Sequence, residues 1–233
     1  MGSFLKKCKI SYVMFSLIVL CALAFGFYRF YWMQRPMYAV TEIFTAVRKG
    51  DAITFTKFVD LDSVYGHVYD DTVKFLVKQN ESSVNHPKWL SRKLTGNLAV
   101  TVLKTFRPEV VTVLSEMTVK NIANRQLKGD TVSSEIVTQK GMSGFFVTLA
   151  DTVAEQNDFK NLDAVSIDVN ESVEGKAQGY VKFVSRETQK PFTLKFAMIQ
   201  YPAGTWKVTQ ILNFDEMLER VKSTPLPLDD ILR

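Results

Sequence analysis

Eighteen consecutive residues, from Ile10 to Phe27, carry no charge, and this run constrains the fold more than any other feature of the chain. As an α-helix it is roughly 27 Å long at about 1.5 Å per residue, close to the roughly 30 Å hydrocarbon core of a bilayer. We therefore expect a transmembrane anchor over residues 10–28. Residues 1–9 then form a tail, and residues 29–35 form a juxtamembrane segment.

The flanks of this run predict its orientation in the membrane. Basic residues concentrate on the cytoplasmic side of a first span, and aromatic rings prefer the membrane interface. The expected interface anchors are Lys6, Lys7 and Lys9 before the run and Tyr28, Arg29, Tyr31 and Trp32 after it. The prediction is a single-pass protein of the plasma (inner) membrane, with a cytosolic N-terminus and an extracytoplasmic C-terminal domain.

A cleaved signal peptide is the alternative to a retained anchor. Residues 22–24, Ala-Leu-Ala, fit the small-x-small cleavage pattern and follow an apolar stretch. Apolar character continues past them at Phe25 and Phe27, which favours retention. Cleavage before Phe25 would instead give a soluble exported binding protein.

The excess positive charge belongs to the anchor. Five of the 29 basic residues and none of the 24 acidic residues precede Pro36, so residues 36–233 hold 24 of each. Nucleic-acid binding depends on a basic excess, so we expect no nucleic-acid partner. Both cysteines, Cys8 and Cys21, also precede Pro36, which excludes a disulfide or a thiolate ligand in the domain. We expect no metal and no cofactor.

Residues 36–233 are predicted to form one exported α+β domain, in which helices precede a four-stranded antiparallel meander sheet. Its expected parts are a helical part (36–127), an irregular connection (128–162), the sheet and a final helix (163–222) and a tail (223–233).

Helix signals fill the first half of this domain. Apolar residues recur at helical spacing up to Gly50, Asp51 is placed to cap a short second helix, and Asp62 is placed to cap a third. A fourth helical pattern begins near Trp89, and we expect Pro108 to interrupt it.

Strand signals fill the second half. A short helix is expected around residues 145–153, before the strands begin. Apolar and polar residues then alternate in four runs, at 165–170, 177–183, 192–198 and 206–212. Asn213, with Glu216 three residues later, predicts the start of the final helix.

Three short segments carry a resemblance: Val-Arg-Lys-Gly-Asp at 47–51, Phe-Val-Asp-Leu-Asp-Ser-Val at 58–64 and Gly-Thr-Trp-Lys-Val at 204–208. They resemble an uncharacterised bacterial family known as domain of unknown function 2939. The resemblance implies one N-terminal anchor, several helices and a C-terminal sheet. At the level of fold alone, this order is similar to the NTF2-like and cystatin-like superfamily.

Two clusters of charged residues are candidates for chemistry or for binding. His67 has acidic neighbours, as a metal site or a general base requires, but helix caps and surface pairs explain the same residues: Asp60, Asp62, Asp70 and Asp71. A basic amphipathic stretch could lie on anionic lipid headgroups, or it could pack its apolar side on the core and expose its charges to water. Its residues are Lys88, Trp89, Arg92, Lys93, Lys104 and Arg107.

A small-molecule pocket is predicted on the sheet, where Gln210 is expected to point inward beside Phe196, Met198 and Trp206. One polar group in an apolar concavity is typical of ligand sites. A buried glutamine that bonds a neighbouring helix end explains the same pattern.

The sequence favours a non-catalytic binding or assembly module of the cell envelope. Its expected partners are the lipid bilayer and an envelope protein, and the sequence identifies no small-molecule ligand. One alternative is a small NTF2-like lyase or isomerase, which requires an inward-facing Asp, His or Tyr with a shifted pKa. The other is the soluble exported binding protein that signal cleavage would give.

Overall fold

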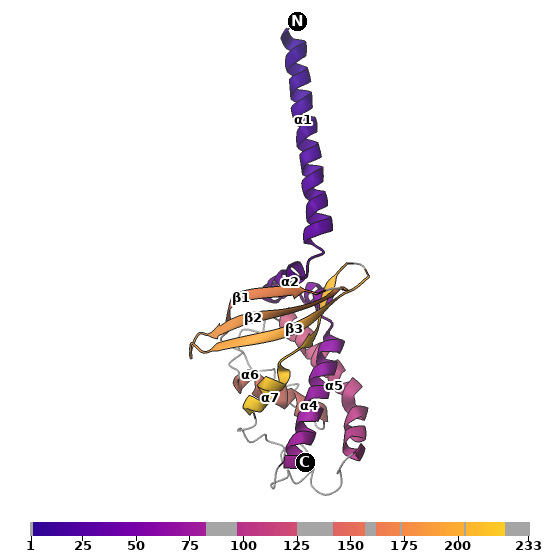
Figure 1. Ribbon diagram of the computed structural model, residues 1–233, viewed down its shortest axis with the longest axis vertical. Coiled ribbons are helices and arrows are strands. Elements are labelled where there is room, and N and C mark those ends of the chain that lie inside the picture. The colour runs from indigo at the N-terminus through magenta and orange to yellow at the C-terminus, as the bar shows by residue number, and fades with distance from the viewer. Residues whose placement is uncertain are drawn as a thin grey trace.

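The computed structural model confirms the predicted α+β class, with N-terminal helices followed by a four-stranded antiparallel sheet (Figure 1). It describes residues 2–82, 97–124, 142–156, 162–172, 174–202 and 204–221. The elements are α1 (Gly2–Phe27), the π-helix η1 (Tyr28–Trp32), α2 (Pro36–Lys49), α3 (Ala52–Phe58), α4 (Leu61–Ser82), α5 (Asn97–Ala123), α6 (Met142–Gln156), β1 (Leu162–Glu171), β2 (Lys176–Ser185), β3 (Pro191–Gln200), β4 (Trp206–Ile211) and α7 (Phe214–Val221). Helix α6 contains the short helix that was predicted and lies within the connection at 128–162.

Helix α1 stands apart from the rest of the molecule and leads through η1 into the packed helices and sheet (Figure 1). Its side chains are described from Met14 onward, so residues 10–13 of the uncharged run lie outside that description. Large apolar side chains of α1 are exposed, Leu17 by 55%, Ile18 by 61% and Leu23 by 67%. Within the part of the chain that the structure describes, no helix is both long and apolar enough to cross a membrane.

Glycine and aspartate define the boundary between α2 and α3. Gly50 ends α2 in the left-handed conformation, with a φ angle of 71°, which glycine adopts without steric cost. Asp51 then caps α3, because its carboxylate accepts a hydrogen bond from the Thr54 N–H at 2.9 Å. Both features follow the sequence prediction.

The cap of α4 is Asp60, and the prediction of Asp62 was wrong. Asp60 Oδ1 accepts a hydrogen bond from the Ser63 N–H at 3.1 Å. Just before it, Val59 forms a parallel bridge with Val208 of β4. This bridge holds the chain extended, so the helix begins at residue 61 and Asp60 occupies the cap position.

The predicted interruption at Pro108 was also wrong, because α5 continues through this residue. Proline lacks a backbone donor, which leaves the carbonyl of Lys104, four residues earlier, without its helical partner. Both residues are exposed, so water can bond that carbonyl. Residues 83–96, where the pattern near Trp89 begins, lie outside the described residues.

The sheet has the strand order β1-β2-β3-β4, which is the predicted meander. The register is regular between β2 and β3. It shifts at Val165 in β1 and at Thr209 in β4, where each edge strand contains one extra residue. Such bulges change the face on which the following side chains lie.

Two buried clusters form the core. One joins α2 and α3 to the sheet and includes Phe58 and Trp206. The other joins α4 to α7 with the sheet and includes Tyr69, which stacks on Phe146 with ring centroids 4.6 Å apart. Val208 of β4 and Phe183 of β2 pack against both clusters, so the sheet connects the two parts of the core.

Candidate functional site

The residues of the predicted sheet pocket are mostly core residues. Phe196, Met198 and Trp206 are 4%, 1% and 1% exposed, and they pack in the same cluster as Ala39 and Phe58. Their side chains fill the space between α2, α3 and the sheet instead of lining an empty site. The pockets described below lie elsewhere.

Gln210 lies on the other face of the sheet from these side chains. It pairs with Ala197, whereas Met198 pairs with Val208. The extra residue Thr209 separates the two pairs, so the two-residue alternation assumed from the sequence does not hold across it. Gln210 is therefore not a neighbour of the Met198 side chain, which differs from the predicted arrangement.

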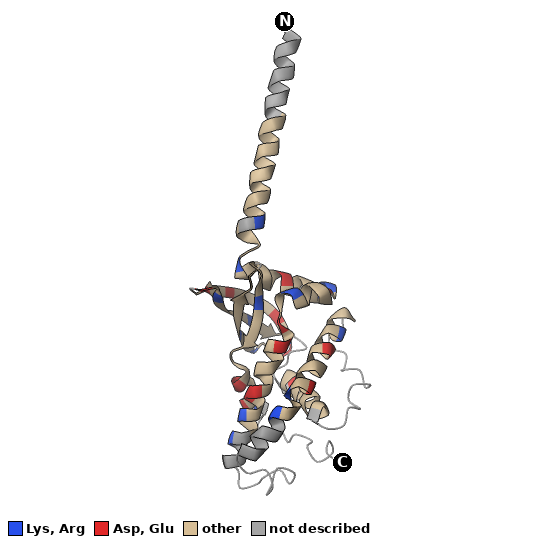
Figure 2. Cartoon of the chain, turned by 90° about the vertical axis from the view of Figure 1, so that its right-hand side faces the viewer, with Lys and Arg blue, Asp and Glu red and all other residues tan. Residues whose placement is uncertain are grey.

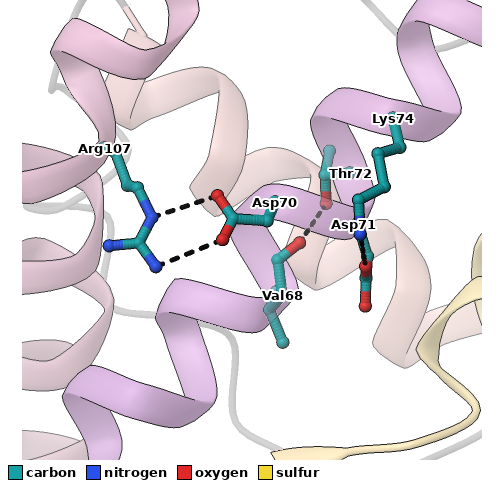
Figure 3. Close-up of polar contacts among 6 residues, drawn as sticks. All are labelled: Val68, Asp70, Asp71, Thr72, Lys74 and Arg107. Atoms are coloured by element: carbon teal, nitrogen blue, oxygen red, sulfur yellow. Dashed lines mark hydrogen bonds and ion pairs between the residues drawn. The ribbon is translucent and has the colours of Figure 1, made fainter.

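Two of the acidic residues near His67, Asp70 and Asp71, form ion pairs. Asp70 forms two hydrogen bonds with Arg107 of α5, from Nε to Oδ1 at 3.0 Å and from Nη2 to Oδ2 at 3.2 Å (Figure 3). Asp71 pairs with Lys74 of the same helix at 2.9 Å (Figure 3). His67 itself is exposed. Among the described residues, no three His, Cys, Asp or Glu side chains lie together as a metal site requires.

Asp60 connects the start of α4 to the turn between β3 and β4. Its Oδ2 accepts a hydrogen bond from the Tyr201 hydroxyl at 2.7 Å, and the Lys207 ammonium lies 5.2 Å from the centre of the Tyr201 ring. Partial burial raises the pKa of Asp60, but the bonds from Tyr201 and Ser63 and the charge of Lys207 outweigh burial and leave this pKa below its ordinary value of 3.8. This cluster therefore favours an ionised carboxylate that holds two elements together.

Two tyrosines have strongly raised pKa values. Partial burial, with a contribution from Glu42, raises the pKa of Tyr38 to about 12. Burial, with a contribution from Asp70, likewise raises the pKa of Tyr69 to about 12. A general acid or base works best with a pKa near the operating pH, so these two hydroxyls suit packing better than proton transfer.

The predicted basic stretch is described only in part. The side chains of Lys104 and Arg107 are described, and Arg107 is the partner of Asp70. The others lie outside the described residues: Lys88, Trp89, Arg92 and Lys93. The tail at 223–233 lies outside them too.

The predicted interface residues after the uncharged run lie at the base of α1. Tyr28, Tyr31 and Trp32 are each about half exposed, and Arg29 is exposed. Figure 2 shows the described length of α1 free of charged side chains down to this base. The side chains before the run are not described: Lys6, Lys7 and Lys9.

Two contacts fasten the base of α1 to the sheet. Trp206 Nε1 donates a hydrogen bond to the Gln34 carbonyl at 2.7 Å, and Arg35 pairs with Glu171 at 3.3 Å. Arg35 also donates to the Tyr31 hydroxyl at 2.6 Å, and its guanidinium lies 4.5 Å from the centre of that ring. We call these residues the joint: Tyr31, Gln34, Arg35, Glu171 and Trp206. The joint links the direction of α1 to that of the sheet.

An open pocket of about 600 Å³ lies beside the joint. It is lined by Gln34, by the turn between β1 and β2 at Glu174 and Gly175, and by the turn between β3 and β4 at Tyr201 and Gly204. Small-molecule sites are mostly apolar and enclosed. This pocket is polar and open, so it does not fit such a ligand.

A groove of about 400 Å³ lies between α2 and the edge strand β1. One wall is a stripe at helical spacing on α2: Met37, Thr41, Phe44, Thr45 and Arg48. The other wall is residues 164–167 of β1. We call these residues the α2–β1 groove. Val165 is 66% exposed and Met37 is 37% exposed, so the groove presents apolar surface to its surroundings.

Sequence reasoning did not identify the α2–β1 groove. The stripe on α2 is visible in the sequence, but it includes two threonines and an arginine and so does not form an apolar pattern. Val165 is one of the apolar residues of its predicted alternating run, and the bulge at this residue leaves its side chain exposed.

No protein-family model matches the chain, and neither a curated protein nor a solved structure matches it. The assignment of a function therefore depends on the geometry of α1, the joint and the α2–β1 groove.

Proposed function

We propose that the protein is a single-pass membrane protein whose exported domain is a non-catalytic binding or assembly module of the cell envelope. In this proposal, residues 10–28 cross the plasma (inner) membrane, the N-terminus lies in the cytosol, and the domain lies on the extracytoplasmic side. One observation carries the proposal: α1 is a free-standing helix whose apolar side chains are exposed on every face.

The exposed side chains of α1 follow one another without a polar face. Each is between 40% and 68% exposed: Met14, Phe15, Leu17, Ile18, Val19, Leu20, Leu23 and Phe25. A helix that is apolar all round is stable in a protein core or in a bilayer, and the described part of the domain does not cover this one. The uncharged run begins earlier, at Ile10, so its full length is close to the thickness of the hydrocarbon core.

The base of α1 has the chemistry of a membrane interface. Tyr28, Tyr31 and Trp32 are half-exposed aromatic residues, which prefer the headgroup region. Arg29 and Arg35 follow the run, whereas three lysines precede it, and this asymmetry favours a cytosolic N-terminus. An anchor of this kind is also what the resemblance to domain of unknown function 2939 implies; that resemblance stays a prediction.

A binding role fits the domain better than catalysis does. The side chains of the predicted pocket are packed in the core, and the described acidic residues near His67 are engaged in caps and ion pairs. What the domain offers to other molecules is surface, namely the α2–β1 groove. Surfaces of this kind suit a protein partner.

Membrane fractionation of the full chain tests the anchor. We expect the chain to stay with membranes after alkaline carbonate extraction and to keep an intact N-terminus at Met1 or Gly2. The variant Leu20→Arg places a charge within the uncharged run, at an expected cost of about 2.5–3.5 kcal/mol to insertion, and should be released. Ile53→Arg is the matched control, because Ile53 is 86% exposed on α3, and it should stay with membranes.

Either of two results would contradict the anchor: release of the unmodified chain by carbonate, or an N-terminus at Phe25. A pull-down from detergent-solubilised membranes tests the assembly role. A chain that returned as a monomer with no associated protein would contradict that role.

A further inference from the structure

The two edges of the sheet differ. At β4, Val59 bridges Val208, and the Asp60 N–H donates a hydrogen bond to the Val208 carbonyl at 2.9 Å, so the middle of this edge is occupied. Strand β1 is ten residues long and pairs with β2 on one side, while none of the described residues pairs with its other side. An open edge presents unpaired backbone N–H and C=O groups, which can accept a further strand.

The α2–β1 groove follows this open edge. The register places Ala164 and Ile167 on the inner face of β1, beside the groove, and it places Asp163, Ser166 and Asp168 on the outer face. The side chains of an added strand would also alternate between the inner and the outer face of the sheet, because successive side chains of a strand point to opposite faces. Every second side chain of an added strand would therefore enter the groove.

The two faces of β1 differ in chemistry. The groove is lined by apolar and uncharged side chains, apart from Arg48 near the end of α2. Strand β1 contains three acidic residues and no basic one. Asp163 pairs with Arg186 and Glu171 pairs with Arg35, both within the chain. Asp168 is exposed and has the neutral hydroxyl of Tyr180 as its hydrogen-bond partner, so a cation from outside has access to it.

We infer that β1 binds an extended segment of an envelope protein as an added strand, in which apolar residues alternate with Lys or Arg. This inference rests on the proposed function as a binding module. The apolar side chains of the segment enter the α2–β1 groove, and its basic side chains lie on the outer face beside Asp168. The backbone groups of β1 supply the hydrogen bonds.

A second copy of the chain fits this edge poorly. Two β1 strands side by side would place no basic side chain of β1 beside the exposed Asp168 of either copy, because β1 contains none. Like charges on neighbouring strands destabilise their pairing. The charge of β1 therefore favours a basic segment of a different protein over self-association.

Labelled peptides test this inference with the full chain in neutral detergent micelles. The probes are a peptide of alternating Val and Lys, a peptide of alternating Val and Glu, and a Val–Lys peptide with proline in place of alternate valines. We expect the Val–Lys peptide to bind at least roughly tenfold more tightly than the other two, because glutamate meets Asp168 and proline cannot donate to the ladder. Hydrogen exchange of residues 162–171 should slow only with the Val–Lys peptide.

Two substitutions locate the site. Val165→Lys places a charge at the mouth of the groove and should weaken binding of the Val–Lys peptide roughly tenfold. Ile199→Lys is the matched control, because Ile199 is an exposed apolar residue on β3, and it should leave binding unchanged. Asp168→Lys should reverse the preference between the Val–Lys and Val–Glu peptides.

Several outcomes overturn the inference: equal binding of the Val–Lys and Val–Glu peptides, equal binding of the proline peptide, unchanged exchange over 162–171, or undiminished binding by Val165→Lys. A dimer that Val165→Lys dissociates would show self-association instead. Carbonate extraction of cells that express the same chain tests the membrane anchor separately from peptide binding. Release from membranes with peptide binding intact contradicts the anchor alone, and retention without peptide binding contradicts the added strand alone.

Discussion

Glu174 is a residue with an unusual backbone conformation at a tight turn. Its φ angle is 75°, and Gly175 follows with a φ angle of 70°. Two consecutive positive φ angles are the pattern of a type I′ hairpin turn, which strongly prefers Asn-Gly. Glutamate has a side chain that disfavours this conformation, whereas asparagine tolerates it.

Glu174→Asn should therefore raise the free energy of unfolding, by up to about 1 kcal/mol. Urea denaturation of the full chain in micelles, followed by circular dichroism, measures the change. Glu174→Gln is the matched control, because it removes the same charge without the left-handed preference of asparagine, and it should leave stability nearly unchanged. Equal stabilisation by both variants would mean that charge, and not backbone conformation, is responsible.

Asp60 is a partly buried residue whose charge links stability to pH. Its pKa in the folded protein lies below the ordinary value of 3.8. The stabilisation that this carboxylate provides is therefore complete above pH 3.8 and is lost as the pH falls through the lowered pKa.

Asp60→Asn keeps a side chain that can cap α4 but removes the negative charge of the carboxylate, which the Tyr201 hydroxyl and the Lys207 ammonium stabilise. We expect this variant to be less stable than the unmodified chain by about 1 kcal/mol at pH 7. The difference should shrink as the pH falls below about 4 and should vanish below the lowered pKa. Denaturation at a series of pH values measures it, with Asp62→Asn as the control. A difference that does not change with pH would contradict this account.

At the scale of elements, Gly66 is the close contact between α4 and α5. A Cβ atom at this position would lie 2.5 Å from Arg107 Nη2, which also bonds Asp70 (Figure 3). Alanine is a better helix former than glycine by about 1 kcal/mol. Gly66→Ala must therefore displace the Arg107 guanidinium to gain this advantage.

Gly66→Ala should stabilise the protein by about 1 kcal/mol when Arg107 is replaced by alanine, and by less when Arg107 is present. The Asp70–Arg107 pair is partly exposed, so the coupling should be no larger than about 1 kcal/mol. A double-mutant cycle measures it. Asp71→Asn, which removes the neighbouring pair with Lys74, is the control and should show no coupling with Gly66→Ala.

Elements were more predictable than the details of their contacts. The spacing of apolar residues along the chain predicted the helices and the four-stranded meander that follows them. This spacing is informative because a buried face needs an apolar residue at every turn of a helix or at every second position of a strand. Bulges at Val165 and Thr209 were not predictable, since nothing in the local alternation marks an extra residue. They expose Val165 and place Gln210 on the outer face, so the expected pocket and the observed groove differ.

Long-range contacts explain the remaining differences. Asp60 became the cap of α4 because β4 holds the preceding residue extended. The final helix begins directly after Asn213, as predicted, but the Asn213 amide bonds the backbone of β3 at both ends, at Lys195 (2.9 Å) and at Thr193 (2.8 Å). Each of these partners is distant in the sequence, so local patterns could not indicate them.

At the scale of the whole molecule, the joint sets how the sheet is presented relative to α1. The Trp206 indole is 1% exposed and its bond to the Gln34 carbonyl is partly buried, whereas the Arg35–Glu171 pair is exposed by nearly half on each side. A hydrogen bond from a buried donor holds its geometry better than an exposed ion pair does. If α1 crosses a membrane, this bond determines how the open edge of β1 faces a partner.

Loss of the joint should broaden the range of angles between α1 and the sheet. Spin labels at the native Cys21 and at Ile199→Cys, in a Cys8→Ser background, report one distance across the joint by pulsed electron paramagnetic resonance. We expect a narrow distance distribution in the otherwise unmodified chain and a broader one when Trp206→Phe is combined with Arg35→Gln, because phenylalanine keeps an aromatic ring but cannot donate to the Gln34 carbonyl. Arg107→Gln removes an ion pair far from the joint and should leave the distribution narrow. Equal widths in all three proteins would mean that packing alone fixes the direction of α1.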